Sequence, residues 1–68
     1  MTDLKKFNAL IDGSDYPINV IAKKAGMTTQ SLRNKRNGTR ELTVGEILAF
    51  AKIFNLTKKE RDEIFLLQ

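Results

Sequence analysis

Apolar residues recur every three or four positions along most of this 68-residue chain, which is the spacing of a buried stripe on an α-helix. The pattern predicts five helices, over residues 3–12, 17–25, 29–37, 43–54 and 57–67, and no strand. The expected core positions are Leu4, Phe7, Leu10, Ile11, Ile18, Ile21, Ala22, Ala25, Leu32, Val44, Ile47, Leu48, Ala51, Phe54, Ile64 and Phe65, with Phe50 and Ile53 widening the stripe of the fourth helix. The sequence therefore predicts one compact all-α domain over residues 1–68, with the strongly apolar fourth helix at its centre.

Residues that favour helix ends stand where the apolar pattern starts and stops. Four threonines suit the N-cap position, namely Thr2, Thr28, Thr43 and Thr57. The last two are followed three positions later by Glu46 and Glu60, which is the sequence pattern of a capping box. Pro17 suits the first position of the second helix. The expected helix stops are Gly13, Gly26, Gly38 and Asn55.

The composition excludes several kinds of site. The chain contains no cysteine and no histidine, so it lacks disulfides, thiolate metal ligands and the commonest general base. It has no Ser/His/Asp, Cys/His or phosphate-loop arrangement. No apolar run approaches the roughly 20 residues that span a bilayer. We therefore expect no enzymatic activity, no cofactor, no metal and no membrane contact, and a cytoplasmic location.

Positive charge is concentrated between residues 23 and 40, although the net charge of the whole chain is only +4. This segment contains no acidic residue and six basic ones, which leaves −2 for the rest of the chain; the six are Lys23, Lys24, Arg33, Lys35, Arg36 and Arg40. Like charges held together repel one another unless an anion offsets them, so the segregation indicates a polyanionic partner. A solvated surface is the alternative, and charge alone does not distinguish DNA from RNA, acidic protein or lipid.

The third expected helix divides its side chains between two faces. One face carries Thr28, Leu32 and Lys35, and the opposite face carries Gln30, Arg33, Asn34 and Asn37, with Thr29 at its edge. In the DNA major groove Gln and Asn bind adenine through two hydrogen bonds, and Arg binds guanine in the same way. The flanking cations suited to phosphates are Lys23, Lys24, Arg36 and Arg40. The layout fits a major groove, although an ordinary solvated helix face has a similar composition.

The spacing of Ala22, Gly26 and Leu32 carries a resemblance to a known family. An alanine allows the second helix to pack closely on the third, a glycine permits a sharp turn, and a leucine anchors the third helix. With the stretch GMTTQSLRNKRNG and five helices, nearly the whole chain resembles the lambda-repressor-like, or Cro-type, branch of the helix-turn-helix DNA-binding family. The resemblance implies a five-helix lambda-repressor-like domain with a helix-turn-helix in the second and third helices.

The resemblance also implies contact residues. Those expected to read bases are Thr28, Thr29, Gln30, Arg33 and Asn34. Those expected to hold phosphates are Asn19, Lys23, Asn37, Gly38, Thr39 and Arg40, to which the charge pattern adds Arg36. The chain departs from the family at Ile18, where a glutamine is common, and at Lys35, where an apolar anchor is usual. We expect the Lys35 stem to cover the edge of the core while its ammonium reaches solvent.

The sequence thus favours a sequence-specific double-stranded DNA-binding regulator of transcription, with repression as the expected mode. A module this small buries little DNA surface, so we expect a homodimer on an inverted-repeat operator in a bacterial or phage-infected cell. The expected dimer contact is Phe65, Leu66 and Leu67, unless these residues close the core instead. The alternative is a protein-interaction module that binds and modulates another regulator. RNA binding is disfavoured, because the phenylalanines occupy core stripes and leave few rings to stack on bases.

Overall fold

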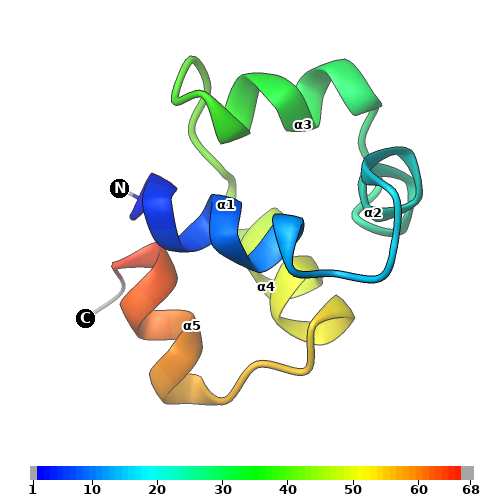
Figure 1. Ribbon diagram of the computed structural model, residues 1–68. Helices are drawn as coiled ribbons and strands as arrows, with labels where there is room; N and C mark the ends of the chain where they lie inside the picture. The colour runs from blue at the N-terminus through cyan, green and yellow to red at the C-terminus, as the bar shows by residue number, and fades with distance from the viewer. Residues whose placement is uncertain (1, 67–68) are drawn as a thin grey trace.

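The computed structural model describes residues 2–66, which form five α-helices and no strand (Figure 1). The helices are α1 (Leu4–Asp12), α2 (Ile18–Lys24), α3 (Thr29–Arg36), α4 (Val44–Ile53) and α5 (Lys58–Phe65). The predicted all-α character is confirmed, and each helix is one to three residues shorter than the sequence pattern suggested. Within the described range no helix has both the length and the apolar character that crossing a membrane would require.

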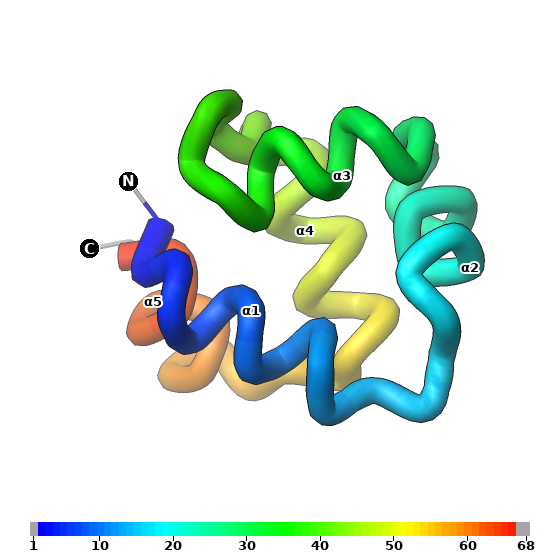
Figure 2. Tube along the Cα trace, turned by 45° about the horizontal axis from the view of Figure 1, so that its top comes forward, coloured from blue at the N-terminus to red at the C-terminus, as the bar shows by residue number. Residues whose placement is uncertain are grey.

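The helices enclose a single cluster of buried side chains. Helices α1 and α4 lie in the middle of the molecule, with α3 and α5 on different sides of them and α2 at one end (Figures 1 and 2). Helix α2 packs against α3 and α4, and α1 packs against α3 and α5. The Asp3 amide also donates a hydrogen bond of 2.8 Å to the Ile64 carbonyl, which joins the start of α1 to α5. Contacts with α1 and α2 therefore hold α3 against the rest of the domain.

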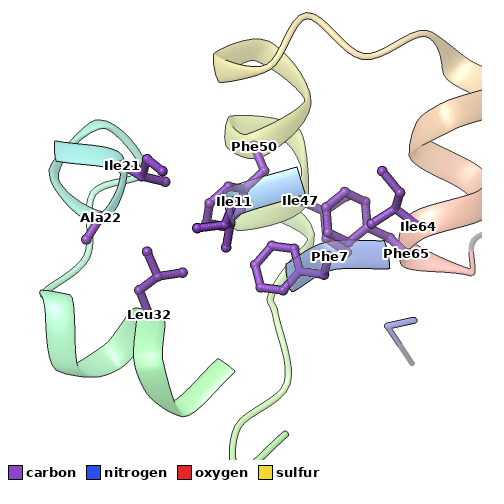
Figure 3. Close-up of a cluster of buried hydrophobic side chains, with 9 residues drawn as sticks. All are labelled: Phe7, Ile11, Ile21, Ala22, Leu32, Ile47, Phe50, Ile64 and Phe65. Atoms are coloured by element: carbon purple, nitrogen blue, oxygen red, sulfur yellow. The ribbon is translucent and has the colours of Figure 1, made fainter. Parts of the chain in front are cut away.

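Every helix contributes at least one side chain to the buried core (Figure 3). The buried apolar residues are Phe7, Ile11, Ile21, Ala22, Leu32, Ile47, Phe50, Ile64 and Phe65. The Phe7 ring meets the Phe50 ring edge to face, with centroids 5.3 Å apart, and lies 5.9 Å from the Phe65 ring. Aromatic pairs of this kind contribute about 0.5–1.5 kcal/mol beyond the area they bury. Phe7 thus joins α1 to both α4 and α5.

The buried face of α4 differs from the predicted one. Val44 and Leu48, which the apolar pattern assigned to the main core stripe, are 72% and 51% exposed. Ile47 is buried as predicted, and Phe50, which was expected only to widen the stripe, is buried beside it. Apolar residues surround most of this helix, so their spacing alone does not determine which side faces inward. The Phe7 ring selects the side that carries Phe50, and Val44 and Leu48 are consequently left on the surface.

Most predicted helix ends are confirmed. Thr28, Thr43 and Thr57 are N-caps, and the last two form complete capping boxes with Glu46 and Glu60. The other predicted starts are each displaced by one residue. Asp3 caps α1 in place of Thr2, because its carboxylate accepts a hydrogen bond from the Lys6 amide, and Pro17 is the extended N-cap of α2 instead of its first helical residue.

The predicted helix stops differ in whether their backbone is left-handed. Asn55 adopts a left-handed backbone, with φ of 52°, as expected of a helix stop. Gly13 also ends its helix, but with φ of −82° it does not use the left-handed conformation. Leu66 adopts a left-handed backbone after α5, so this helix stops at Phe65 instead of continuing to the predicted Leu67. Leu67 lies outside the described residues.

Two glycines with left-handed backbones flank α3 and allow a matched test of stability. A Cβ on Gly26, with φ of 75°, would meet no atom within 4 Å, whereas a Cβ on Gly38, with φ of 83°, would lie 2.9 Å from the Leu4 Cδ1 atom. Alanine at either position therefore incurs backbone strain of about 1 kcal/mol, and alanine at Gly38 must also displace Leu4. We expect each substitution to lower the free energy of unfolding by about 1 kcal/mol, because the Leu4 Cδ1 atom is the end of a flexible side chain and can turn away from Gly38 at low cost. Urea denaturation of both variants would measure the two losses, and an unchanged free energy of unfolding would contradict a left-handed backbone at these glycines.

Candidate functional site

The chain reverses direction sharply between α2 and α3. Gly26 supplies the left-handed residue of this turn, and the Met27 amide donates a hydrogen bond of 2.9 Å to the Ala22 carbonyl. Ala22 is buried, so its small side chain allows α3 to approach α2 closely. Leu32 is fully buried on the inner side of α3. The three residues singled out by their spacing thus set how α3 is placed on the domain.

The outer side of α3 carries hydrogen-bonding side chains. Gln30 and Arg33 are exposed, and Asn34 is half-buried. The Gln30 Nε2 atom donates to the Asn34 Oδ1 atom at 3.1 Å, so each amide group orients the other. The Arg33 side chain has no hydrogen-bond or ion-pair partner among residues 2–66. Three of the predicted base-reading side chains therefore share one accessible surface.

The other two predicted base-reading residues lie at the start of α3. Thr28 is exposed, and its Oγ1 atom accepts a hydrogen bond of 3.0 Å from the Ser31 amide as the N-cap of the helix. The Thr28 hydroxyl proton is not used in this bond and is available to a ligand. Thr29 is half-buried. Of the two, Thr28 is the better placed to contact a partner.

The loop after α3 is held in one shape by its own polar groups. The Asn37 Oδ1 atom accepts hydrogen bonds from the Thr39 amide at 3.0 Å and from the Thr39 hydroxyl at 2.5 Å. The Thr39 and Arg40 amides donate to the Asn34 carbonyl at 2.9 and 3.2 Å. All four loop residues from 37 to 40, which the sequence predicted as phosphate contacts, are exposed. The loop thus presents the Arg40 charge on an ordered backbone directly beyond α3.

The predicted contacts on α2 are also accessible. Asn19 and Lys23 are exposed. The neighbouring Lys24 is exposed as well, but its ammonium lies 4.9 Å from the centre of the Tyr16 ring. Asn19 and Lys23 belong to a different helix from the other predicted contacts, and the close packing of α2 on α3 brings the two helices together.

Arg36, by contrast, is bound to α1. Its Nε atom donates to the Asn8 Oδ1 atom at 2.6 Å, and its Nη2 atom pairs with the Asp12 Oδ1 atom at 2.6 Å. Asn8 completes the connection by donating from Nδ2 to the Arg36 carbonyl at 2.9 Å. Sequence reasoning treated Arg36 as a phosphate contact because partners 24 and 28 residues away leave no local pattern. In the structure Arg36 joins the end of α3 to α1, and its contact with a phosphate stays a prediction.

Lys35 is more buried than expected. The residue is only 8% exposed, and its ammonium contacts the Glu46 Oε2 atom at 2.5 Å and the Ser31 hydroxyl at 3.3 Å. The expected exposure of this ammonium was therefore wrong. The long side chain reaches a carboxylate that the capping box of α4 already fixes in place. The sequence did contain a signal for this ion pair, namely a lysine at a position where an apolar anchor is usual and a capping-box glutamate further along the chain.

The environment of Glu46 favours its charged form. Burial alone would raise the pKa of Glu46, but hydrogen bonds from the Lys35 ammonium and from the Thr43 amide and hydroxyl, with the attraction of the Lys35 charge, hold this pKa below its ordinary value. The Glu46 Oε1 atom accepts from the Thr43 amide at 2.9 Å, while Oε2 faces Lys35. One carboxylate thus caps α4 and fixes α3 to the start of α4.

A shallow polar groove of about 410 Å³ runs between α3 and the segment that leads into α4. Four predicted contact residues line it, namely Thr28, Gln30, Asn34 and Arg40. Ser31, Lys35, Glu41 and Thr43 complete its walls. The groove offers hydrogen-bond donors and acceptors beside one exposed cation, while the Glu41 carboxylate gives one part of its wall a negative charge. The arrangement can bind an extended polar partner along α3, and the side nearer Arg40 is suited to an anion.

The predicted dimer contact is only partly available. Phe65 is buried in the core against Phe7, so it closes the domain instead of meeting a second copy. Leu66 is 46% exposed, and Leu67 lies outside the described residues. Comparison with known proteins finds no protein-family model, no curated protein and no solved structure that matches this chain.

Proposed function

We propose that this chain is a sequence-specific double-stranded DNA-binding regulator of transcription that places α3 in the major groove. The observation that carries the proposal is the exposed face of α3, where Gln30, Arg33 and Asn34 lie together. Their side chains are the types that bind adenine and guanine edges through paired hydrogen bonds. An exposed helix face that carries these groups and no acid is the surface that a base-reading helix requires.

The rigid attachment of α3 supports this role. Leu32 anchors the middle of the helix in the core, the Lys35 ammonium binds Glu46, and the Arg36 guanidinium binds Asp12. These attachments leave the opposite side of the helix free. Base recognition needs side chains held in a fixed orientation, and a helix fixed on its inner side provides it.

The surroundings of α3 supply contacts suited to the DNA backbone. Arg40 and Lys23 are exposed on the loop and on α2, and Asn37 and Thr39 add polar groups. Cations that meet phosphates release bound counterions, which makes affinity strongly dependent on salt. The absence of acidic residues between Lys23 and Arg40 is consistent with this placement, since a carboxylate there would face phosphate.

The α2–turn–α3 geometry is consistent with a helix-turn-helix of the lambda-repressor-like kind. Gly26 forms the turn, Ala22 lies at the α2–α3 contact, and Leu32 anchors the second helix of the pair. One domain of this size covers only a short stretch of duplex. We infer that two copies bind an inverted repeat, with the α3 helices in successive major grooves. Such a complex would repress transcription by blocking access to the promoter.

Selection from a pool of randomised DNA duplexes at near-physiological salt, followed by binding of the enriched duplex over a salt series, tests this proposal. We expect an inverted repeat and a slope of log affinity against log salt of about −4 to −7, which corresponds to roughly two to four phosphates neutralised per copy. Unselected duplex should bind more weakly with a similar slope, because phosphate contacts do not depend on sequence. A pool that shows no enrichment would contradict sequence-specific binding, and an enriched single half-site would contradict only the inferred pair of copies.

A further inference from the structure

A second accessible hollow lies away from the α3 groove. It has a volume of about 420 Å³ and is lined by Tyr16, Lys24, Ala49, Lys52 and Ile53, which we call the lysine hollow. None of these residues lines the groove beside α3. The Tyr16 ring is 46% exposed and is held by the Lys24 ammonium 4.9 Å above it. The hollow thus combines an aromatic surface with two cations.

The exposed side of α4 extends this surface with apolar residues. Leu48 lies one helical turn before Lys52, and Val44 lies one turn before Leu48, so the three side chains form a row on the same side of the helix. Val44 and Leu48 are mostly exposed, and Lys52 is the only charged residue in the row. Single exposed apolar residues are common on protein surfaces, but a row that leads to an exposed tyrosine is typical of an interaction surface.

The charge of the lysine hollow indicates the kind of partner. Its walls contain two lysines and no carboxylate, so an approaching anionic group would gain attraction without repulsion from the walls. A second copy of the chain fits less well, because each copy carries a net charge of +4 and would bring the same two lysines to the contact. The DNA backbone also fits less well, since it offers no apolar group to cover Leu48 and Val44. The complementary partner is a protein segment with carboxylates next to an apolar side chain.

We propose that the lysine hollow and the α4 row of Val44 and Leu48 together bind an acidic segment of a partner protein. The apolar side chain of that segment covers Leu48 and the Tyr16 ring, and its carboxylates meet Lys24 and Lys52. This contact lies outside the α3 groove and is independent of the proposed DNA binding. It gives the chain a means to recruit or to be controlled by another protein while α3 remains free.

Titration of the full ¹⁵N-labelled chain with a capped hexapeptide of sequence EDLFED, followed by NMR, tests the proposal. We expect chemical-shift changes at Tyr16, Lys24, Leu48 and Lys52. The peptides EDGGED and KKLFKK, which remove the apolar pair or reverse the charges, should bind at least about tenfold more weakly. Changes confined to α3, an equal response to all three peptides, or no response at millimolar peptide would overturn the proposal.

Matched variants distinguish specific binding at the lysine hollow from non-specific electrostatic or hydrophobic binding elsewhere on the surface. We expect Lys52→Glu and Leu48→Ser each to weaken EDLFED binding by about tenfold or more. The controls are Lys59→Glu on α5 and Leu66→Ser, which alter an exposed lysine and an exposed leucine elsewhere and should change binding by less than about twofold. Equal losses in the controls would overturn the assignment. Shift changes on dilution without peptide, at these same residues, would assign the surface to a second copy instead.

Discussion

Replacement of Glu46 by alanine is expected to lower the free energy of unfolding by about 3 kcal/mol. The substitution leaves the Lys35 ammonium buried with the Ser31 hydroxyl as its remaining contact and removes the side-chain half of the α4 capping box. An uncompensated buried charge is among the most destabilising changes in a folded protein. In a domain whose total stability is on the order of 5 kcal/mol, this loss should be evident in urea denaturation at pH 7.

Glu60 provides the matched control for this substitution. It completes the same kind of capping box on α5, with its Oε1 atom 2.9 Å from the Thr57 amide, but its carboxylate lies at the surface and meets no buried lysine. Glu60→Ala should therefore cost much less than Glu46→Ala. The double variant Lys35→Met, Glu46→Gln should recover most of the loss, because no charge then remains buried. Equal effects of the two alanine substitutions would mean that the ion pair adds nothing to the cap.

The same pair predicts how stability depends on pH. The folded-state pKa of Glu46 lies below its ordinary value of 4.5, so the contribution of this carboxylate is fully present above about pH 5 and is lost as pH falls through the folded-state pKa. Urea denaturation between pH 3 and pH 7 should show a steeper acid loss for the natural chain than for Glu46→Gln, which has no carboxylate to protonate. Parallel pH profiles would show that Glu46 does not contribute to the acid sensitivity.

Local sequence signals predicted the helices well. A threonine with a glutamate three residues later forms its hydrogen bonds within a single turn, so the capping boxes at Thr43 and Thr57 could be read directly from the chain. The left-handed stops at Gly26, Gly38 and Asn55 depend on the backbone of one residue and were equally accessible. Gly26 and Gly38 stand on either side of α3, so the sequence alone identifies which side chains this helix carries.

Contacts between residues far apart in the chain could not be predicted from local sequence patterns. The Arg36 guanidinium is bound by side chains from α1, and the Lys35 ammonium by a residue in α4. The sequence pattern placed Arg36 among the phosphate contacts and predicted that the Lys35 ammonium would reach solvent, because a sequence shows the sign of a charge but not its neighbours. The exposed row of Val44 and Leu48 was missed for a related reason, since the orientation of α4 is set by aromatic contacts with α1. Tertiary contacts thus removed two cations from the exposed surface and added an apolar row.

The two arginines of α3 should separate DNA recognition from folding. Arg33 is exposed and has no partner among residues 2–66, so Arg33→Ala should leave the free energy of unfolding within about 0.5 kcal/mol of its original value. If Arg33 reads a guanine, the same substitution should weaken binding to the selected duplex by about 1–3 kcal/mol, or roughly 5- to 150-fold, and relax preference at one base pair. Equilibrium binding to the selected duplex and to its single-base variants would measure both effects.

Arg36→Ala should give the opposite result. It removes the bonds to Asn8 and Asp12, so we expect a loss of about 1 kcal/mol in the free energy of unfolding. Affinity for DNA, measured at a temperature where the variant is fully folded, should fall by less than about threefold, because the guanidinium already faces α1. A larger loss of affinity for Arg36→Ala than for Arg33→Ala would mean that the end of α3 meets the DNA, and that its outer face does not.

Arg33→Lys then distinguishes base reading from simple charge attraction. Lysine keeps the positive charge but lacks the planar fork that donates two parallel hydrogen bonds to guanine. If Arg33 only neutralises a phosphate, lysine should restore the affinity for every duplex and leave the salt slope unchanged. If Arg33 reads a base, lysine should restore the salt slope while preference at that base pair stays weakened, because charge acts on all sequences alike and the fork acts on one. Only the second result would support the placement of the outer face of α3 against base edges.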